Sequence, residues 1–535
     1  MLRFTLAQVT TRPLRSLVDP RLALAALAVA CCGACCMAPA PQVQVKYADS
    51  PLLLAQFPPT GDSAVPRFDA ETASVVLPPG TPNCTSGSIV LGTGKNDRYA
   101  SSTALDCLGQ ATCFSTAEQG AVVPAGTIDL PTAAGTGTSC AGIPTAPAAA
   151  YVDGYSDHQV VRTTAAGELI RVVLGFGISV PMAPPCNTPA GRNLFFVDTS
   201  PDCGVTWTSR ALIDSDPGYD RQELYRDPWD GRLYLTAAGS QGHELLVSAD
   251  GGMSWSGPAV IDINAGGDRP IVTTSFPAGT APNPRIVLFT CLGATPSLFW
   301  SDDLGTSFSS VSLLDFNAGL PQCAILPDAA FSPPMWNALS VSIGRAGYTT
   351  VADVVHVLYP TVTAAGAGNR QDAVLANVRI TRGAQNTATV LMIQQLVGDG
   401  GASVYRPRLI DADRWDYQPD ETAGDANVAL IDWYEVTPPA AGSASSTAQM
   451  RFRGEVVRGG AGVSAPFDLA VTGGAAKQWT PAPLTSVTNF YGHYDNGSFF
   501  MQNGMFNFLA HWTESNAAVS VDNGYVYGNV VQVKQ

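Results

Sequence analysis

The sequence predicts an all-β chain, a six-bladed β-propeller whose blades are antiparallel sheets of four strands. A short turn pattern occurs three times, and its aspartates Asp202, Asp250 and Asp303 lie 48 and 53 residues apart. An interval of that size is typical of one propeller blade. A second pattern, a short strand followed by a turn and a strongly apolar strand, occurs six times after residue 150. Its alternating apolar residues and glycine-rich turns fit antiparallel strands.

Residues 1–36 are expected to be an export signal. Several arginines precede the apolar run 22–30, which is too short to span a bilayer. The run ends in Ala28-Val29-Ala30-Cys31, which is similar to the lipobox at which bacteria attach lipid to a cysteine. We therefore expect an exported bacterial protein, held at the outer membrane or cell surface through a lipid on Cys31. Free secretion after ordinary cleavage near Ala34 or Ala38 is the alternative.

Residues 37–148 are predicted to be a tether followed by a small β segment. The part up to about residue 60 is rich in Pro, Ala and Gln, as linkers are. Residues 61–148 are rich in Gly, Thr, Ser and Ala and contain four cysteines. This segment reads as a small disulfide-stapled β unit, and a seventh blade is the alternative if it joins the propeller at 149–535.

Eight cysteines follow the signal, and an even number in an exported chain predicts disulfides. Connectivity cannot be deduced from spacing alone. The pairs that we expect are Cys186–Cys203, Cys291–Cys323, Cys107–Cys113 and Cys84–Cys140.

The three turns lie at 200–207, 248–255 and 301–308, and each follows an apolar strand. All fit Ser-x-Asp-x-Gly-x-(Thr/Ser)-aromatic. Ser and Asp side chains can accept from nearby backbone N–H groups, glycine tolerates positive φ, and the aromatic ring can cover the hairpin. The shared residues are Ser200, Asp202, Gly204 and Trp207, then Ser248, Asp250, Gly252 and Trp255, then Ser301, Asp303, Gly305 and Phe308.

This pattern resembles the Asp box, or bacterial neuraminidase repeat, of sialidases and related propellers. The resemblance covers about residues 150–535 and implies a sialidase-like propeller. In that family the box fixes an outer hairpin away from the ligand face. The turn residues are therefore expected to be structural.

The residue that opens each of the six strand repeats is the informative position for ligand binding, because the first strands of all blades converge at the mouth of a propeller. The six residues are His158, Arg221, Arg269, Asn337, Arg406 and His493. The resemblance implies an arginine clamp for the carboxylate of sialic acid, and arginine suits bidentate carboxylate binding. We expect Arg221, Arg269 and Arg406 to bind substrate with His158 and His493. The alternative is that Asp220 and Asp268 merely pair with the adjacent arginines and neutralise the rim.

Catalysis in that family uses a tyrosine nucleophile activated by a glutamate, with an aspartate as acid and base. By family order, the resemblance implies Tyr491 or Tyr494 as nucleophile, with Asp157 as acid; Glu223, beside Tyr225, is a further catalytic residue. The chain departs from the family, since the Phe/Tyr-Arg-Ile-Pro signature is absent and Tyr405-Arg406-Pro407 is only similar to it. Its arginines also fall on repeats two, three and five, whereas the family uses one, four and five.

Composition and motifs restrict the remaining functions. The net charge of −15 argues against a nucleic-acid partner, and no Gly-x-Ser-x-Gly elbow or zinc spacing supports a serine or zinc hydrolase. No cofactor is expected, although calcium is a weak alternative at the acidic loop Asp411, Asp413, Asp416, Asp420, Glu421 and Asp425. We expect recognition of extracellular glycans, with exo-α-sialidase activity left open. The alternative is a non-catalytic surface propeller that binds a protein or a polysaccharide.

Overall fold

The computed structural model has two compact units, residues 1–44 with residue 535 and residues 45–534. The second unit contains almost every strand. No helix in the part of the chain described below is long and apolar enough to cross a membrane. The described residues are 44–47, 51–56, 70–77, 81–83, 87–94, 119–123, 154–163, 167–178, 192–204, 208–213, 215–216, 218–262, 270–275, 284–315, 319–326, 341–348, 352–365, 368–381, 387–411, 428–437, 449–458, 461–462, 464–479, 497–502, 504–515 and 524–534.

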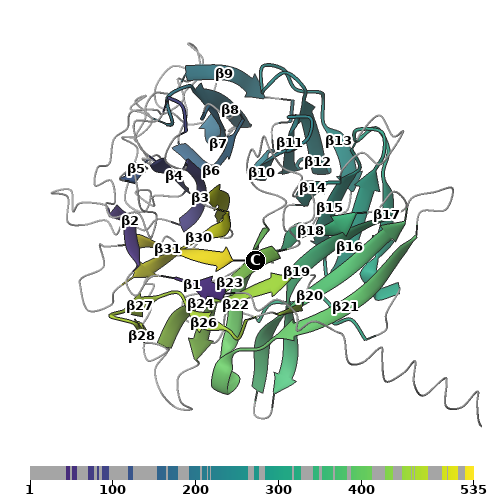
Figure 1. Cartoon of the computed structure of the whole chain (residues 1–535). Helices are drawn as coiled ribbons and strands as arrows, with labels where there is room; N and C mark the ends of the chain where they lie inside the picture. Colours follow the sequence, from purple (N-terminus) through teal and green to yellow (C-terminus); the bar gives the residue numbers. More distant parts are fainter. Residues whose placement is uncertain are drawn as a thin grey trace, which may run out of the picture. The chain divides into compact units, whose positions relative to one another are not determined.

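Four antiparallel sheets of four strands follow one another from residue 154 to residue 396, each with its strands in chain order (Figure 1). The first two sheets contain β6 (Gly154–Arg162), β7 (Leu169–Ile178), β8 (Arg192–Ser200) and β9 (Thr208–Ile213), then β10 (Asp220–Arg226), β11 (Leu233–Gly239), β12 (Gly242–Ser248) and β13 (Ala259–Asp262). The next two contain β14 (Ile271–Thr274), β15 (Ile286–Leu292), β16 (Thr295–Ser301) and β17 (Ser309–Ser312), then β18 (Ser342–Tyr348), β19 (Ala352–Ala365), β20 (Gly368–Thr381) and β21 (Ala388–Leu396).

Two further sheets are built from the rest of the C-terminal region. One contains β22 (Ser403–Asp411), β23 (Val428–Thr437) and β24 (Gln449–Arg458), with β25 (Ala461–Gly462) and β26 (Phe467–Asp468) on β24. The other contains β29 (Ser498–Gln502), β30 (Met505–Ser515) and β31 (Gly524–Lys534). A small hairpin pairs β27 (Val471–Thr472) with β28 (Ala475–Ala476).

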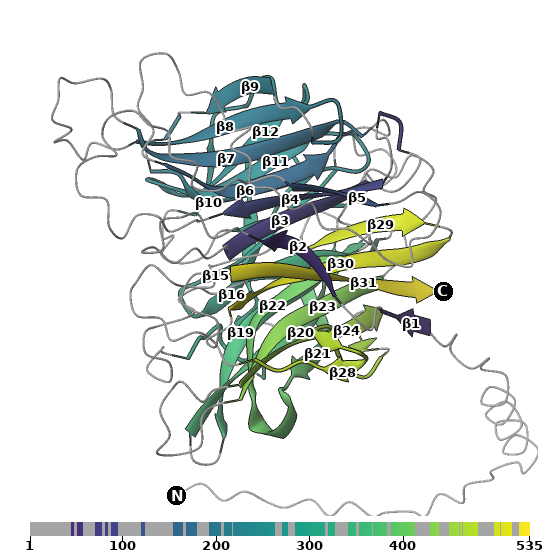
Figure 2. The same ribbon diagram turned by 90° about the vertical axis from the view of Figure 1, so that its left-hand side faces the viewer.

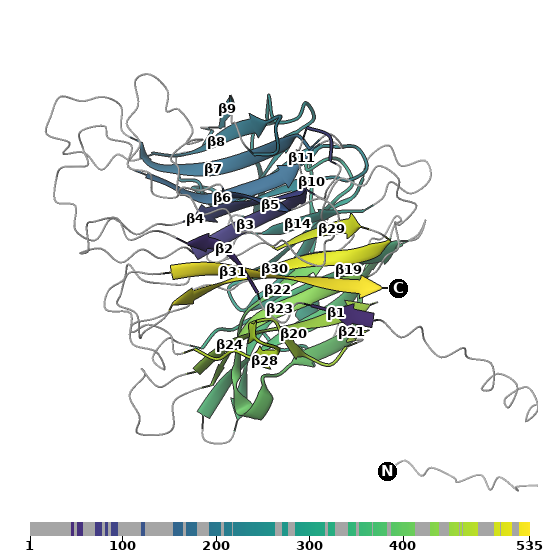
Figure 3. The same ribbon diagram turned by 60° about the vertical axis from the view of Figure 1, so that its left-hand side comes forward.

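The last sheet takes its outer strands from the opposite end of the chain. Both β1 (Gln44–Lys46) and β2 (Leu52–Gln56) pair with β31 (Figure 3). In the antiparallel register of β2, Leu52 pairs with Gly528 and Gln56 with Tyr525. The segment for which the sequence predicts a tether therefore contributes strands that complete this sheet.

A seventh sheet precedes the six that the sequence predicts. It contains β3 (Ala70–Leu77), β4 (Gly87–Gly94) and β5 (Gln119–Val123). Both β3 and β4 contact β6 (Figure 2), and β3 also contacts β29. The described residues thus contain one such sheet more than the six predicted blades, and its contacts with both neighbouring sheets fit the alternative of a seventh blade.

The first strands of successive sheets touch one another. β6 contacts β10, β10 contacts β14, β14 contacts β18, β18 contacts β22, and β22 contacts β29. Apolar cores lie between these successive sheets: one joins Val172 to Leu224, and the next joins Tyr234 to Leu288. The inner strands are therefore buried on both faces, which explains why the predicted second strands are almost continuously apolar.

The predicted apolar strands are confirmed in all six repeats. Their residues lie in β7, β11, β15, β19, β23 and β30. Each is the second strand of its sheet in chain order, if the last sheet is counted from β29. Only the outermost strands show a clear alternation between buried and exposed residues, as in β21. Strands that are covered by a neighbouring sheet on each face therefore show little alternation between apolar and polar residues. Their residue types identify them as strands instead.

The Ser-x-Asp-x-Gly turns connect the third and fourth strands of three sheets and share their hydrogen bonds. Each serine hydroxyl donates to the aspartate, at 2.9 Å from Ser200, 2.8 Å from Ser248 and 2.7 Å from Ser301. Each serine oxygen also accepts from the glycine N–H at 2.8 Å. These are the turn contacts that the sequence predicts, and the end of the first turn, including Trp207, lies outside the described residues.

A second set of hydrogen bonds lowers the pKa of the aspartates in the later turns. The Ser254 hydroxyl and the Ser254 N–H both donate to Asp250 and lower its pKa to about 2. Burial acts to raise the pKa of Asp303, but hydrogen bonds from Ser307 and Ser301 outweigh it and the pKa is lowered. Both carboxylates therefore stay ionised as acceptors over the physiological pH range.

The turn glycines also make room for the preceding sheet. Gly305 has φ +86°, and a Cβ atom there would lie 2.9 Å from Cδ2 of Leu245 in β12. An alanine at this position would therefore strain the left-handed backbone. Its Cβ atom would also overlap with the buried side chain of Leu245. We expect Gly305→Ala to lower the free energy of unfolding by about 2–4 kcal/mol, as measured by urea denaturation.

Gly293 offers a matched control for this substitution. It is also left-handed, with φ +58°, but no atom lies within 4 Å of its Cβ position. Gly293→Ala should lower the free energy of unfolding only through strain in the left-handed backbone, by about 1 kcal/mol. Equal losses in the two variants would show that contact with Leu245 contributes nothing.

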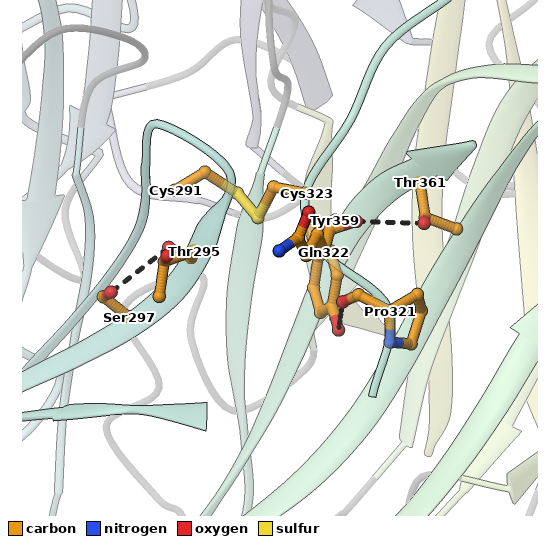
Figure 4. The surroundings of a disulfide bond; sticks show 8 residues. All are labelled: Cys291, Thr295, Ser297, Pro321, Gln322, Cys323, Tyr359 and Thr361. Carbon is orange, nitrogen blue, oxygen red and sulfur yellow. Dashed lines mark hydrogen bonds between the residues drawn. A yellow bond between two sulfur atoms is a disulfide. The ribbon is translucent and has the colours of Figure 1, made fainter. Parts of the chain in front are cut away.

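The predicted disulfide Cys291–Cys323 is present and fixes the segment 319–326 after β17 (Figure 4). Cys291 lies in β15, and the Cys323 N–H donates to Ala294 O at 2.9 Å. On the other side, the Tyr359 hydroxyl donates to Pro321 O at 3.1 Å and the Thr361 hydroxyl to Gln322 O at 2.9 Å. We call 319–326 the strap, because it joins the β15–β16 hairpin to the β19–β20 hairpin.

Cys203 also forms a disulfide, and its partner lies outside the described residues. Its pairing with Cys186 stays a prediction, as do the pairs Cys107–Cys113 and Cys84–Cys140.

Candidate functional site

The first strand of three sheets carries a bulge that includes the predicted ligand-binding positions. Two residues of the first strand there face a single residue of the second strand, and the pairs are Asp157–His158 in β6, Arg221–Gln222 in β10 and Arg406–Pro407 in β22. Bulges of this kind redirect a side chain away from the regular pleat. In these three sheets the opening residue of the sequence repeat therefore coincides with a bulge in the backbone.

Arg221 and Arg406 share an unusual backbone conformation at these bulges. Their φ angles are +52° and +49°. Residues other than glycine seldom adopt positive φ, which costs roughly 1–3 kcal/mol and is concentrated at binding and catalytic sites. Neither arginine side chain makes this conformation easier, so the surrounding sheets must stabilise it.

The Arg406 side chain is largely buried among aromatic groups. It is 7% exposed, and its guanidinium carbon lies 5.9 Å from the centre of the Tyr434 ring in β23. The Tyr434 hydroxyl in turn accepts from the Thr513 N–H of β30 at 2.8 Å. A guanidinium over an aromatic face is attracted by the ring quadrupole, so Tyr434 stabilises the partly desolvated charge of Arg406.

Arg221 is more open and lies beside the acid that precedes it. Its side chain is 26% exposed, and its Nε atom is 3.9 Å from the Asp220 carboxylate. The Arg221 N–H also donates to that carboxylate at 2.8 Å. A pair this long and this exposed contributes little to stability. The alternative, in which the preceding acid pairs with the arginine and neutralises the rim, therefore agrees in part with the geometry of Arg221 and Asp220.

Arg221 and Arg406 lie on sheets that are not adjacent in the succession of contacts, because β14 and β18 lie between their strands β10 and β22. Arg269, His493, Tyr491 and Tyr494 lie outside the described residues, and so does Asn337. Asp157 and His158 are placed by their backbone alone, at the bulge of β6.

Glu223 lies two residues after Arg221 and is fully buried. It shares a face of β10 with Tyr225, because side chains two apart on a strand point the same way. Tyr225 is 1% exposed, and its hydroxyl hydrogen-bonds Thr274 of β14 at 3.0 Å. Both side chains of the Tyr225–Glu223 couple are therefore buried, and Tyr225 also hydrogen-bonds the neighbouring sheet.

A pair of carboxyl groups beside the β10 bulge could not be found from the sequence. Asp216 precedes β10, and Glu244 lies in β12 and is buried. Burial first and the charge of Asp216 second raise the pKa of Glu244 to about 7. Burial acts to raise the pKa of Asp216 as well, but donors from Ser240 and Gly218 lower it overall.

No group of three or more metal-ligating side chains occurs among the residues that the structure describes. Of the acidic loop proposed as a weak calcium site, only Asp411 is described, and it is buried at the end of β22. The rest of that loop lies outside the described residues.

No protein-family model matches the chain, and no curated protein does. Solved structures to which the chain is similar include the NanB sialidase of Streptococcus pneumoniae, at 10% identity and TM-score 0.39, over 72% of this chain and 67% of that one. Another is the intramolecular trans-sialidase of Ruminococcus gnavus, at 10% identity and TM-score 0.37, over 70% and 91%. A third is the GH93 α-L-arabinofuranosidase of Fusarium graminearum, at 12% identity and TM-score 0.33, over 70% and 91%. Sialidases, to which the sequence is predicted to be similar, are thus among them.

Proposed function

We propose that this chain is an exported, seven-bladed propeller that binds a carboxylate-bearing glycan at its first-strand bulges. The observation that supports this most directly is the shared left-handed conformation of Arg221 and Arg406, each in a first-strand bulge. The seventh blade is the sheet of β3, whose contacts with β6 and β29 complete the succession of first strands. A propeller of this kind presents the starts of those strands around one opening.

The chemistry of the arginines favours an acidic sugar over a neutral one. A guanidinium offers two parallel N–H donors that match the two oxygens of a carboxylate, and it stays charged when partly buried. The chain carries a net charge of −15, so a general attraction for anions is absent. Selectivity for a carboxylate must then come from locally placed cations such as Arg406.

Export is part of this proposal. The Cys291–Cys323 disulfide is buried at both ends, and structural disulfides are typical of proteins outside the cytoplasm. This supports the export signal predicted at 1–36, and a lipid anchor at Cys31 is a separate part of the proposal. Fractionation of the expressing cells should find the protein in the membrane, and its loss to the medium in Cys31→Ser would agree with a lipid anchor.

The proposal is tested by calorimetric titration of the mature protein with 3′-sialyllactose and with lactose as the neutral control. We expect binding of the acidic sugar alone. Arg406→Lys keeps the positive charge but loses the two-pronged donor geometry, so affinity should fall about 10- to 100-fold. Arg221→Ala should also weaken binding, while leaving the fold intact because the side chain is partly exposed.

Arg232→Ala is the matched control, since Arg232 belongs to the same sheet as Arg221 and forms an exposed pair with Asp230 at 2.6 Å. It should bind like the wild type. Equal binding of the two sugars, or wild-type affinity in Arg406→Lys, would overturn the proposal. The same samples with a fluorogenic α-sialoside decide whether binding extends to exo-α-sialidase turnover or the chain is a non-catalytic binding protein.

A further inference from the structure

The bulge in β22 and an aromatic ring of the next strand act on the same arginine side chain. Tyr405 pairs with Tyr434 of β23, and the next regular pair joins Arg408 to Asp432. Side chains alternate along a regular strand, so a regular β22 would point Arg406 away from the face that carries Tyr434. The bulge interrupts this alternation, and the guanidinium carbon of Arg406 lies 5.9 Å from the centre of the Tyr434 ring.

The Tyr434 ring is fixed at its hydroxyl end by the last sheet. Tyr434 is 1% exposed, and its hydroxyl accepts from the Thr513 N–H of β30 at 2.8 Å. A buried phenol hydroxyl needs such a partner, and the hydrogen bond also restricts rotation of the whole ring. The position of the ring beside Arg406 therefore depends on β30 as well as on β23.

A second ring and a second arginine support Tyr434 from the side. Phe452 is the residue of β24 that pairs with Tyr434, and the two rings meet edge to face with 4.9 Å between their centres. The Arg408 guanidinium carbon lies 5.8 Å from the centre of the Phe452 ring, and Arg408 also donates to His511 O of β30 at 2.7 Å. The aromatic face beside Arg406 is thus joined to the backbone of β30 through both Tyr434 and Arg408.

The other two first-strand bulges have no aromatic residue at the equivalent place. The residue before the bulge pairs with Tyr434 in the sheet of β22, but with Ala238 in the sheet of β10 and with Leu174 in the sheet of β6. Arg221 of β10 lies beside an acid instead, with its Nε atom 3.9 Å from the Asp220 carboxylate. Among these three sheets, a ring at this place therefore occurs only in the sheet that contains the more buried arginine.

We infer that Tyr434 is the positioning residue of Arg406: its ring supports the guanidinium, and its hydroxyl bond to Thr513 fixes the ring. Attraction between a cation and an aromatic ring is stronger when the charge is desolvated, and Arg406 is only 7% exposed. A guanidinium that is already held in one orientation loses less freedom when it binds both oxygens of a carboxylate. Tyr434 therefore makes Arg406 the stronger of the two arginine contacts. Its role in ligand binding rests on the function proposed above, whereas the positioning of Arg406 does not.

Arginine labelling with phenylglyoxal tests the positioning without any ligand. The mature wild type, Tyr434→Phe and Tyr434→Leu are labelled, and modification of Arg406 is followed by tandem mass spectrometry of its peptide. Tyr434→Phe keeps the ring but loses the bond to Thr513, so Arg406 should be labelled about threefold faster. Tyr434→Leu also removes the ring, and should accelerate labelling of Arg406 about tenfold.

Tyr359→Phe is the matched control, because Tyr359 is also a buried tyrosine whose hydroxyl bonds the backbone of another segment, at Pro321 O and 3.1 Å. This variant should label Arg406 at the wild-type rate. Arg171 is 2% exposed and lies in another sheet, so its labelling reports loss of the fold. If Tyr434→Leu accelerates labelling of Arg171 as well, that variant has not folded and Tyr434→Phe decides the test.

Two results would overturn the positioning role. One is labelling of Arg406 at the wild-type rate in Tyr434→Phe, which would mean that the hydroxyl bond does not hold the guanidinium in place. The other is an equal acceleration in Tyr359→Phe, which would mean that any lost tyrosine hydroxyl bond loosens the site.

Calorimetric titration with 3′-sialyllactose then tests the role in binding through a double-mutant cycle. Tyr434→Phe should weaken binding about three- to tenfold in the wild-type background and have little further effect in Arg406→Lys, because the two residues act as one unit. A purely structural effect would weaken binding equally in both backgrounds and would contradict the inference. If the wild type does not bind the sugar while labelling behaves as expected, the positioning of Arg406 stands and the proposed function fails.

Discussion

Replacing Asp432 by Asn should lower the free energy of unfolding by about 3–5 kcal/mol, because it leaves a buried arginine without its counter-charge. Asp432 is fully buried in β23, and both of its oxygens accept from Arg408, at 2.6 Å and 2.5 Å. Arg408 is 6% exposed. Asparagine has the same shape, so the loss would reflect the missing charge and not a cavity.

The effect should extend beyond the sheet that contains the pair. Arg408 also donates to the backbone oxygen of His511 in β30, at 2.7 Å. Asp432 therefore orients a group that joins this sheet to the last one. Urea denaturation should show the lower stability, and hydrogen exchange should show the largest loss of protection in β22, β23 and β30.

Asp302→Asn is the matched control, since Asp302 also accepts two bonds from one arginine, Arg285, at 2.7 Å and 2.8 Å. Its side chain is 50% exposed, and Arg285 keeps Asp353 as a second partner at 3.3 Å. The expected cost is about 0–1 kcal/mol. Similar losses at both positions would contradict the argument from burial.

Local features of this fold could be predicted from the sequence because their causes are local. The apolar second strands are marked by residue type, and the turn at Ser248–Trp255 is marked by side chains that bond their own backbone. The Cys291–Cys323 pair was also predicted correctly. Spacing alone did not single out this pairing among the eight cysteines that follow the signal.

Features that depend on distant parts of the chain were missed. The pairing of β2 with β31 joins segments more than four hundred residues apart, and no pattern in either strand specifies the other. The sheet of β3 has few aromatic residues and long connections, so the sequence left open whether this segment is a separate unit or a seventh blade. The repeat of opening residues predicted where Arg221 and Arg406 lie on their strands, but their positive φ values follow only from tertiary packing.

Removing the disulfide in Cys291→Ala/Cys323→Ala should lower the free energy of unfolding by about 3–4 kcal/mol, on the chain-entropy estimate for a loop of this size. The two residues are 32 apart in the sequence. Both are buried, so alanine is tolerated at either position without exposing new apolar surface. Urea denaturation of the oxidised wild type and of the double variant measures the difference.

The strap should respond differently from the rest of the chain, because the disulfide is not its only attachment. Tyr359→Phe removes the hydrogen bond to Pro321 but keeps the cross-link, and should cost only about 1 kcal/mol. In the double variant the remaining bonds, such as Thr361 to Gln322 at 2.9 Å, hold the folded strap in place. Hydrogen exchange in the strap should therefore change little in the folded state, even though global stability falls. If the double variant is as stable as Tyr359→Phe, the cross-link does not restrict the unfolded chain. If hydrogen exchange shows early loss of protection in the strap alone, the disulfide stabilises the native structure instead.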